Sequence, residues 1–133
     1  MKVSELMQPN VRTISSDARV GEVVVSLADA HISGLPVVDN VGRIIGVVSA
    51  TDVLAAEAET ETETVGRELM EETSVRDIMT PRPLTVTPDE DVRDAARQML
   101  YADVHRLFVA RDERLVGVLS TTDIVRAVAT GKL

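Results

Sequence analysis

Apolar residues recur along the chain with two different periods, and the two periods follow one another in the same order twice. Residues 11–15 and 84–87 alternate between apolar and polar side chains, which is typical of a half-buried strand. Each run is followed by apolar residues at positions i, i+3, i+4 and i+7, a spacing that predicts a helix with one apolar face. The first helical set comprises Val20, Val23, Val24 and Leu27, and the second comprises Val92, Ala95, Ala96 and Met99.

Two further apolar runs follow each predicted helix. They occupy residues 35–39 and 44–49 in the first half, and residues 107–111 and 115–120 in the second half. Their β-branched residues and the polar turn between them predict a pair of strands. A second helical pattern then opens at Ser49 and at Ser120. Each half therefore reads β-α-β-β-α, which indicates an α+β fold.

The two halves are copies of one sequence. Residues 3–9, VSELMQP, align with residues 75–81, VRDIMTP, and the alignment continues until GVVSATD meets GVLSTTD. A chain of 133 residues is too short for two independent cores of ordinary size, so the copies are expected to share one. We place the first repeat at residues 1–56 and the second at residues 73–133.

Residues 57–72 lie between the copies and begin with alternating Thr and Glu. They offer no apolar face until Val65, Leu69 and Met70, so the first part has nothing to pack. We predict that the preceding helix extends over residues 57–63 and frays into a solvated, acidic linker. A functional acidic tail is the less favoured alternative.

Composition excludes several classes of function. The chain has no cysteine, 2% aromatic residues and a formal net charge of −8. It therefore lacks disulfides, cysteine nucleophiles and the stacking platforms of single-strand binders, and its charge argues against nucleic acid as a partner. No stretch approaches the roughly 20 apolar residues of a membrane helix. We expect a cytoplasmic protein with no membrane partner.

No arrangement of residues predicts catalysis. The two histidines, His31 and His105, stand outside any nucleophile motif, and GxSxG, GxGxxG and P-loop patterns do not occur. Histidine does not recur with Asp or Glu at the spacing of metal ligands. We therefore expect no enzyme activity, no metal and no cofactor. We interpret His31 as a surface residue.

Three short motifs carry a resemblance to a known family. They are SGLPVVD at residues 33–39, GxxSxTD beginning at Gly46 and Gly117, and the leading segments VSELM and VRDIM. In their order along the chain, with the leading segment first, and in their duplication, these motifs resemble the CBS-domain family. The family is named after cystathionine β-synthase, and its members occur as tandem pairs called Bateman modules. The resemblance implies a three-stranded sheet with two helices in each repeat, and packing of the CBS repeats with pseudo-two-fold symmetry.

The resemblance also implies a ligand. Family members bind AMP, ADP, ATP, S-adenosylmethionine or related adenosyl ligands in clefts between two repeats, and relay occupancy to an enzyme, channel or transporter. We therefore expect a regulatory module that works as a homodimer packed through its helices, with an effector protein as partner. The alternative is a ligand-free interaction module whose clefts are filled by side chains and whose helical face docks the partner.

The SxTD motif offers groups for the ribose and the phosphate of such a ligand. A carboxylate accepts hydrogen bonds from both ribose hydroxyls, and the family's ribose-binding aspartate corresponds to Asp52 and Asp123. The motif also opens a helix, whose free amides suit a phosphate. The phosphate candidates in the motif are Ser49, Thr51, Ser120 and Thr122. The alternative is plain N-capping, in which Ser or Asp satisfies the helix's own amides.

The residues before the second strand differ in charge between the repeats. His105 and Arg106 resemble a His-Arg pair of nucleotide-binding family members, and a guanidinium can make a forked contact with phosphate. The alternatives are a surface salt bridge for Arg106 and an ordinary hydrogen-bonded histidine. The first repeat has Ser33 and Gly34, which carry no charge but allow close approach of a ligand. We therefore expect the two sites to differ.

The resemblance places the adenine pocket on the first strand and around the start of the second, although most of these residues also suit the core. The candidates are Thr13, Ile14, Ile32, Ser33, Gly34, Leu35 and Pro36 in the first repeat, and Thr85, Val86, Val104, Leu107 and Phe108 in the second. Phe108 replaces the proline that the family prefers, and Arg111 replaces the acidic residue found as Asp39. These departures leave the occupancy of the second site open.

Overall fold

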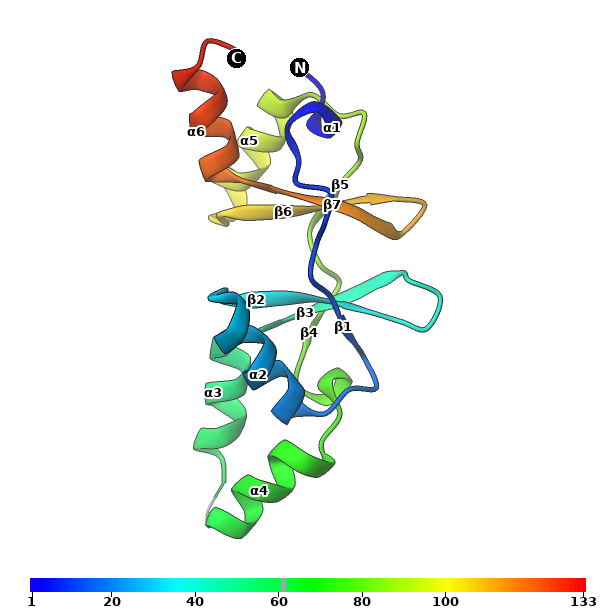
Figure 1. The fold of residues 1–133 in the computed structure, drawn as a ribbon, viewed down its shortest axis with the longest axis vertical. Helices are drawn as coiled ribbons and strands as arrows, with labels where there is room; N and C mark the ends of the chain where they lie inside the picture. Colours follow the sequence, from blue (N-terminus) through cyan, green and yellow to red (C-terminus); the bar gives the residue numbers. More distant parts are fainter. Residues whose placement is uncertain (61) are drawn as a thin grey trace. The chain divides into compact units, whose positions relative to one another are not determined.

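A computed structural model describes residues 1–60 and 62–133 of the chain (Figure 1). The described chain forms two compact units. The first-repeat unit comprises Arg12–Pro83, and the second-repeat unit comprises Met1–Val11 together with Leu84–Leu133. Each unit contains the predicted order β-α-β-β-α, which confirms the α+β class.

The first-repeat unit is built on a four-stranded sheet. Its strands lie in the order β1-β2-β3-β4, with β1 parallel to β2 and the other neighbours antiparallel. The fourth strand comes from the leading segment of the second repeat and adds to the three strands expected. The elements are β1 (Ile14–Ser15), α2 (Val20–Ala30), β2 (Gly34–Val38), β3 (Ile44–Ser49), α3 (Ala50–Ala58), α4 (Glu63–Glu72), the short 3₁₀ helix η1 (Val75–Asp77) and β4 (Thr80–Pro81).

The second-repeat unit has the expected three-stranded sheet. The strand order is β5-β6-β7, with β5 parallel to β6 and β7 antiparallel to it. The elements are α1 (Val3–Leu6), β5 (Thr85–Val86), α5 (Val92–Ala102), β6 (Arg106–Arg111), β7 (Arg114–Ser120) and α6 (Thr121–Ala129).

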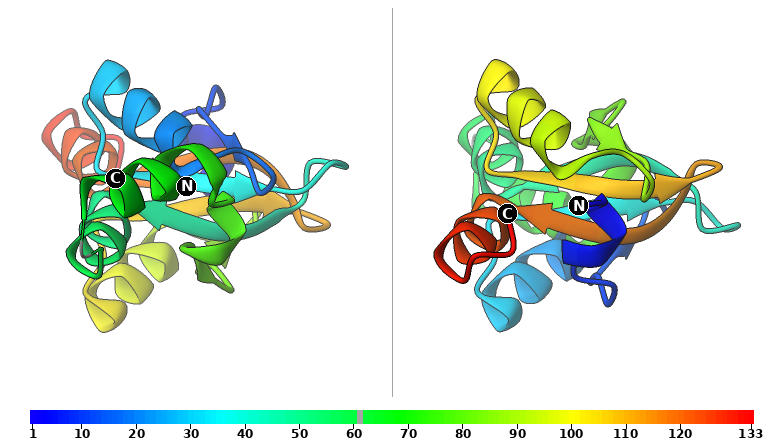
Figure 2. Two further views of the ribbon diagram at one scale, coloured as in Figure 1. Left: turned by 90° about the horizontal axis from the view of Figure 1, so that it is seen from below. Right: turned by 90° about the horizontal axis from the view of Figure 1, so that it is seen from above.

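One face of each sheet packs on the helices of its own unit (Figure 2), so each unit has its own core and the expectation of one shared core is wrong. Alternation along the strands sends Leu35 and Leu107 into these cores and turns Pro36 and Phe108 to the opposite face. The predicted apolar face of the first helix is correct at Val23, which is fully buried, but Val24 is 39% exposed. The largest fully buried core side chains are Val3, Val20, Val23, Leu35, Val37, Val48, Val75, Val92, Val109, Leu107 and Leu119.

The leading segment of each repeat completes the core of the other repeat's unit. Val3 is fully buried in the second-repeat core, and Val75 is fully buried in the first-repeat core. Gln8 pairs with Val118, while Thr80 pairs with Val47 at the corresponding position. The compact units therefore divide the chain differently from the sequence repeats, whose boundaries stay a prediction.

The stretch between the repeats contains more structure than the acidic pattern indicates. Helix α3 continues to Ala58 and α4 begins at Glu63, so the linker is shorter than predicted, and residue 61 of the expected fraying segment lies outside the described residues. Thr62 caps α4 by accepting a hydrogen bond from the Val65 amide at 3.1 Å. The helix packs on α2 at Gly21, where a Cβ would lie 3.0 Å from the Met70 carbonyl oxygen.

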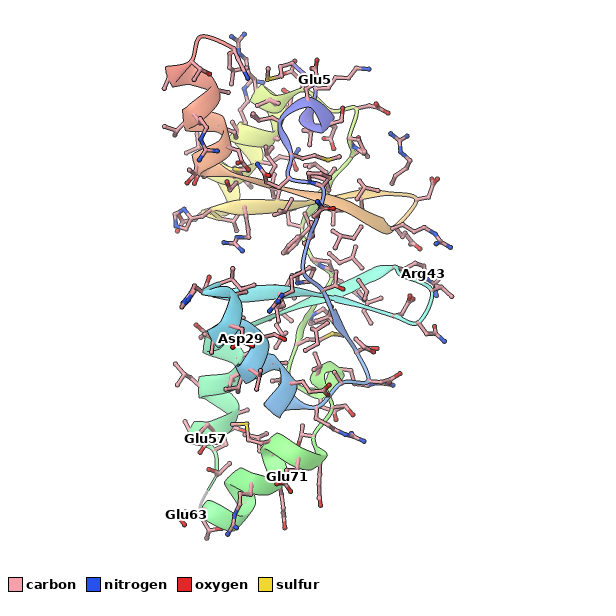
Figure 3. All side chains as sticks on the ribbon, viewed as in Figure 1. Glu5, Asp29, Arg43, Glu57, Glu63 and Glu71 are labelled. Atoms are coloured by element: carbon pink, nitrogen blue, oxygen red, sulfur yellow. The ribbon has the colours of Figure 1, made fainter. Side chains whose placement is uncertain are left out.

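Acidic side chains on α3 and α4 face outward. Figure 3 shows Glu57, Glu63 and Glu71 on the surface of these helices. Their exposure agrees with the solvated character that the Thr-Glu alternation indicates, although the backbone beneath Glu63 and Glu71 is helical. The charge pattern thus predicts the surface of this stretch better than its backbone.

In each unit, a residue with left-handed backbone conformation ends the helix that precedes the central strand, β2 or β6. His31 ends α2 with φ of 52°, and Asp103 ends α5 with φ of 54°. His and Asp are among the residues that tolerate this conformation without being glycine. His31 is exposed, which confirms its interpretation as a surface residue.

A charged turn closes the β2–β3 hairpin. The Asp39 carboxylate accepts hydrogen bonds from the amides of Arg43 at 2.9 Å and Val41 at 3.0 Å, and pairs with the Arg43 guanidinium at 2.8 Å. The hydrogen bond from the Arg43 amide is the main cause that lowers the pKa of the Asp39 carboxyl below its ordinary value.

Replacing this carboxylate gives a pH-dependent loss of stability. Asp39→Asn keeps an acceptor for the amides but removes the charge, so the variant unfolds more easily than the wild type at pH 7. The pKa of the Asp39 carboxyl in the folded state lies below its unfolded value of about 3.9. The difference in unfolding free energy between wild type and variant therefore persists above pH about 4 and shrinks as the pH falls further. Urea unfolding between neutral and acid pH measures it, and a difference that does not change with pH would contradict the prediction.

The motif glycines make room for the leading segments. A Cβ on Gly117 would lie 2.6 Å from the Met7 sulfur, and a Cβ on Gly46 would lie 2.6 Å from the Met79 sulfur. We expect Gly46→Ala and Gly117→Ala each to destabilise the fold by about 1–3 kcal/mol, since the added methyl group displaces the crossing segment. Chemical denaturation measures the loss.

Gly34→Ala is the matched control for these two variants. Its Cβ would meet its nearest neighbour, the Val48 carbonyl oxygen, at 3.6 Å, which is ordinary contact. The control should stay within about 0.5 kcal/mol of the wild type. Equal losses for all three alanine variants would show that close approach of the leading segments is not what selects glycine.

Candidate functional site

The SxTD motif lies where the last strand of each repeat passes into the last helix. Residues 49–52, the first junction, join β3 to α3, and residues 120–123, the second junction, join β7 to α6. The structure thus brings the ribose and phosphate candidates of each SxTD motif together within one turn of helix. Each junction is contained within a single compact unit.

Serine and aspartate form a reciprocal cap at both junctions. The Asp52 amide donates to Ser49 Oγ at 3.1 Å, and the Ser49 amide donates to Asp52 Oδ2 at 2.8 Å. Asp123 and Ser120 repeat these two hydrogen bonds at 3.1 Å and 2.9 Å. The capping that the N-capping alternative requires is therefore present at both junctions. It does not exclude a ligand, because a carboxylate has about four acceptor positions and the cap uses one.

The two carboxylates differ in what else they contact. Asp123 is 5% exposed, and its Oδ1 accepts from Gln8 Nε2 at 3.3 Å and lies 3.7 Å from an Arg126 guanidinium nitrogen. Asp52 is half-buried, and its Oδ1 has no hydrogen-bond partner among residues 1–60 and 62–133. Only the first junction therefore presents an uncommitted carboxylate oxygen.

The helix amides at the junctions are mostly satisfied by the protein. The Ala50 amide donates to the Ser33 carbonyl and the Thr121 amide to the His105 carbonyl, both at 2.9 Å. The aspartate amides are taken by the serine caps. Within the described chain, the amides of Thr51 and Thr122 are the ones left without a partner among the first three of each helix. The predicted phosphate cradle is thus narrower than the motif alone indicates.

The strand register places a different neighbour beside each junction. Gly34 lies opposite Ser49, whereas Arg106 lies opposite Ser120. Arg106 is exposed and makes no ion pair with the residues that the structure describes, so the salt-bridge alternative finds no support. His105 is also exposed, and its carbonyl rather than its ring holds the helix start. The expected difference between the two sites is therefore one of charge.

The predicted adenine residues divide between the two faces of each sheet. Ile14, Leu35, Val86 and Leu107 are buried in the helix-side cores, with Ile32 and Val104 packed against them. These residues can offer a ligand little more than backbone groups. The remaining candidates lie outside the helix-side clusters: Thr13, Ser33, Gly34, Pro36, Thr85 and Phe108. Their roles in binding stay predictions.

Two residues beside the second junction were not predicted. Gln8 reaches Asp123 from the leading segment, and Arg126 reaches it from the next turn of α6. Gln8 aligns with Thr80, and this difference between the repeats was the signal available in the sequence. The sequence difference alone does not indicate a contact with Asp123, because only the fold brings the leading segment across β7.

Comparison with known proteins identifies the family. The CBS domain profile matches residues 3–59 and 75–130, which together make up most of the chain. The chain belongs to the CBS domain family. Its two family segments include both junctions and both leading segments, so the recognised motifs coincide with the parts of the CBS repeats described above.

Relatives of this CBS pair include longer proteins. It is 32% identical to inosine-5'-monophosphate dehydrogenase of Methanocaldococcus jannaschii, over 94% of this chain and 23% of that protein. It is 30% identical to the chloroplastic CBS domain-containing protein CBSX2 of Arabidopsis thaliana, over 94% of this chain and 62% of that protein. The chain thus spans less than two thirds of the length of these curated relatives.

Solved CBS-pair structures share the fold. CBSX2 in complex with AMP is 31% identical, with a TM-score of 0.82 over 99% of this chain and 98% of that chain. The CBS domain pair of protein MJ0100, in complex with 5'-methylthioadenosine and S-adenosyl-L-methionine, is 25% identical, with a TM-score of 0.78 over 99% and 98%.

No helix in residues 1–60 and 62–133 has the length and apolar character required to cross a bilayer. The same residues contain no group of three or more His, Cys, Asp or Glu side chains placed to hold a metal ion.

Proposed function

We propose that this CBS pair is a regulatory module that binds an adenosyl ligand at its strand–helix junctions and passes on the occupancy to an effector protein. The observation that carries the proposal is the uncommitted Oδ1 of Asp52, held at a capped helix start. It is supported by two similar CBS pairs, one in complex with AMP and one with 5'-methylthioadenosine and S-adenosyl-L-methionine.

The cap prepares Asp52 for ribose. The hydrogen bond from the Ser49 amide to Oδ2 fixes the carboxylate's rotamer and leaves Oδ1 to accept from the sugar. An ionised acceptor forms stronger hydrogen bonds than a neutral one. Because the side chain is already ordered, little conformational entropy is lost when the ligand binds. Capping and ligand binding are then two functions of one side chain.

Phosphate recognition belongs to the second junction. Arg106 and the Thr122 hydroxyl are exposed, and Arg106 lies in register with Ser120, so a guanidinium and a helix start serve the same anion. The first junction has Gly34 in that place and carries no equivalent cation. A phosphate-bearing ligand such as AMP should gain from the second junction, whereas S-adenosylmethionine should not.

The proposal includes no catalysis. It also places the protein in the cytoplasm, because a chain without cysteine fits a reducing compartment.

The rival function is that of a ligand-free module that docks a partner. It is favoured by one observation: an apolar groove of about 260 Å³ between α5 and α6, lined in part by Met99, Leu100 and Val125. Titration with adenosyl ligands separates the two functions.

Calorimetric titration of AMP tests the proposal. Asp52→Asn keeps the cap, because the amide oxygen still accepts from Ser49, but it removes the charge that ribose needs. We expect its affinity to fall about ten- to hundredfold, the effect of losing a charge-assisted hydrogen bond. Asp94→Asn, on the outer surface of α5, is the control and should bind as the wild type does. Absence of heat from the wild type at millimolar AMP would reject the function.

Removing the Arg106 side chain should separate ligands by charge. We expect Arg106→Ala to weaken AMP binding about tenfold, because a guanidinium–phosphate contact is lost. Binding of 5'-methylthioadenosine, which has no phosphate, should not change. Arg114→Ala, at the far end of the same hairpin, is the matched control. Equal losses for both ligands would show that Arg106 supports the fold and does not contact phosphate.

We also propose that the module is a homodimer that packs through its helices. Leu100 and Val125, beside the apolar groove, are 83% and 66% exposed. Burying such side chains is worth about 1.5–3 kcal/mol each, so Leu100→Glu and Val125→Glu should shift a dimer to monomer in light scattering. Val41→Glu, an exposed turn residue outside the helices, should leave the mass unchanged. A monomeric wild type would contradict the dimer.

A further inference from the structure

The carboxylate of the second junction is already occupied by the protein. Asp123 is 5% exposed, Oδ2 accepts from the Ser120 amide, and Oδ1 accepts from Gln8 Nε2 at 3.3 Å. The Arg126 guanidinium adds a positive charge at 3.7 Å from the same oxygen. Both carboxylate oxygens are thus engaged by groups of the second-repeat unit.

The first junction has the same backbone and lacks both partners. Thr80 takes the place of Gln8, and the register shows the equivalence, because Thr80 pairs with Val47 as Gln8 pairs with Val118. Ala55 takes the place of Arg126, three residues beyond the aspartate in each helix. Neither a threonine nor an alanine side chain can extend to a carboxylate as glutamine and arginine do.

This difference changes what a ribose must do in order to bind. At the first junction the sugar hydroxyls can donate to Asp52 Oδ1 without displacing a protein group. At the second junction they must replace the Gln8 amide and move the Arg126 side chain, so part of the gain is cancelled by hydrogen bonds that are lost. Gln8 is exposed and Arg126 is 64% exposed, so both side chains have room to leave.

We infer that Gln8 and Arg126 act as a latch on Asp123, so that an adenosyl ligand fills the first junction before the second. The inference rests on the proposed function, since it assumes that both aspartates serve ribose. It assigns a specificity role to two residues outside the SxTD motif. The module then responds to ligand in two steps, at two different concentrations.

Exchange of the latch between the repeats tests the inference. The probe is 5'-methylthioadenosine, which has no phosphate and so separates the sugar contact from Arg106. In the wild type, Asp52→Asn should remove the tighter step of a calorimetric titration. Gln8→Thr combined with Arg126→Ala gives the second junction the residues of the first, and should strengthen the weaker step about three- to tenfold.

The reciprocal variant is the matched control. Thr80→Gln combined with Ala55→Arg installs the latch at the first junction, and should weaken the tighter step by a similar factor. Two results would overturn the inference while leaving the proposed function intact. One is loss of the tighter step in Asp123→Asn, and the other is an unchanged affinity of the weaker step when Gln8 and Arg126 are substituted. No heat from any variant would overturn the proposed function as well.

A measurement without ligand tests the latch itself. In a double-mutant cycle of Gln8→Thr and Asp123→Asn, the unfolding equilibrium constants should show coupling of about two- to tenfold, the value of one hydrogen bond. Both side chains lie at the same junction, and Asp123→Asn retains the cap. A cycle without coupling would show that Gln8 does not hold Asp123, and the ordered filling of the junctions would be rejected.

Discussion

A reciprocal hydrogen-bond pair between serine and aspartate sets the geometry of both junctions. Each cap satisfies amides that the helix start would otherwise leave unpaired, and a capping residue of this kind is worth about 1 kcal/mol. The same pair holds the aspartate in one rotamer, so the requirement of the helix and the requirement of a sugar-binding site are met by one arrangement. Whether the carboxylate can also accept a hydrogen bond from a ligand depends on its second oxygen, Oδ1. This oxygen contacts Gln8 in Asp123 and has no partner among the described residues in Asp52.

The leading segments connect the fold to that difference. Each segment crosses the last strand of the other repeat at a motif glycine, which has no side chain to obstruct the crossing. The crossing brings position 8 beside Asp123 and position 80 into the matching place in the other unit. A residue near the start of one repeat therefore contacts the motif aspartate of the other. The two junctions thus share one backbone arrangement and differ in the side chains beside the aspartate.

The sequence predicted what duplication and periodicity can reveal: the order of strands and helices, the glycine-containing motif and the place of Ser49 and Asp52 at a helix start. It did not reveal the crossing of the leading segments or the bond from Gln8 to Asp123, because both depend on contacts between residues far apart in the chain. Helix α4 was not predicted because the alternating Thr and Glu residues show no helical apolar pattern. Its start is capped by Thr62, and it packs on Gly21 of α2, a contact that the local sequence does not indicate. Val24 lies at helical spacing, yet it is exposed because neighbouring elements do not cover that edge of α2.

The account depends most on the strand–helix junctions being where an adenosyl ligand makes contact. Amide NMR spectra recorded during titration with 5'-methylthioadenosine, which lacks the phosphate that Arg106 would favour at the second junction, test this directly, since each backbone amide at residues 49–52 and 120–123 reports on its own hydrogen bonding. The account predicts that the largest shifts occur at these amides, with those of the first junction saturating at lower ligand concentration. Shifts confined to the outer faces of α5 and α6, with the junction amides unmoved, would contradict it.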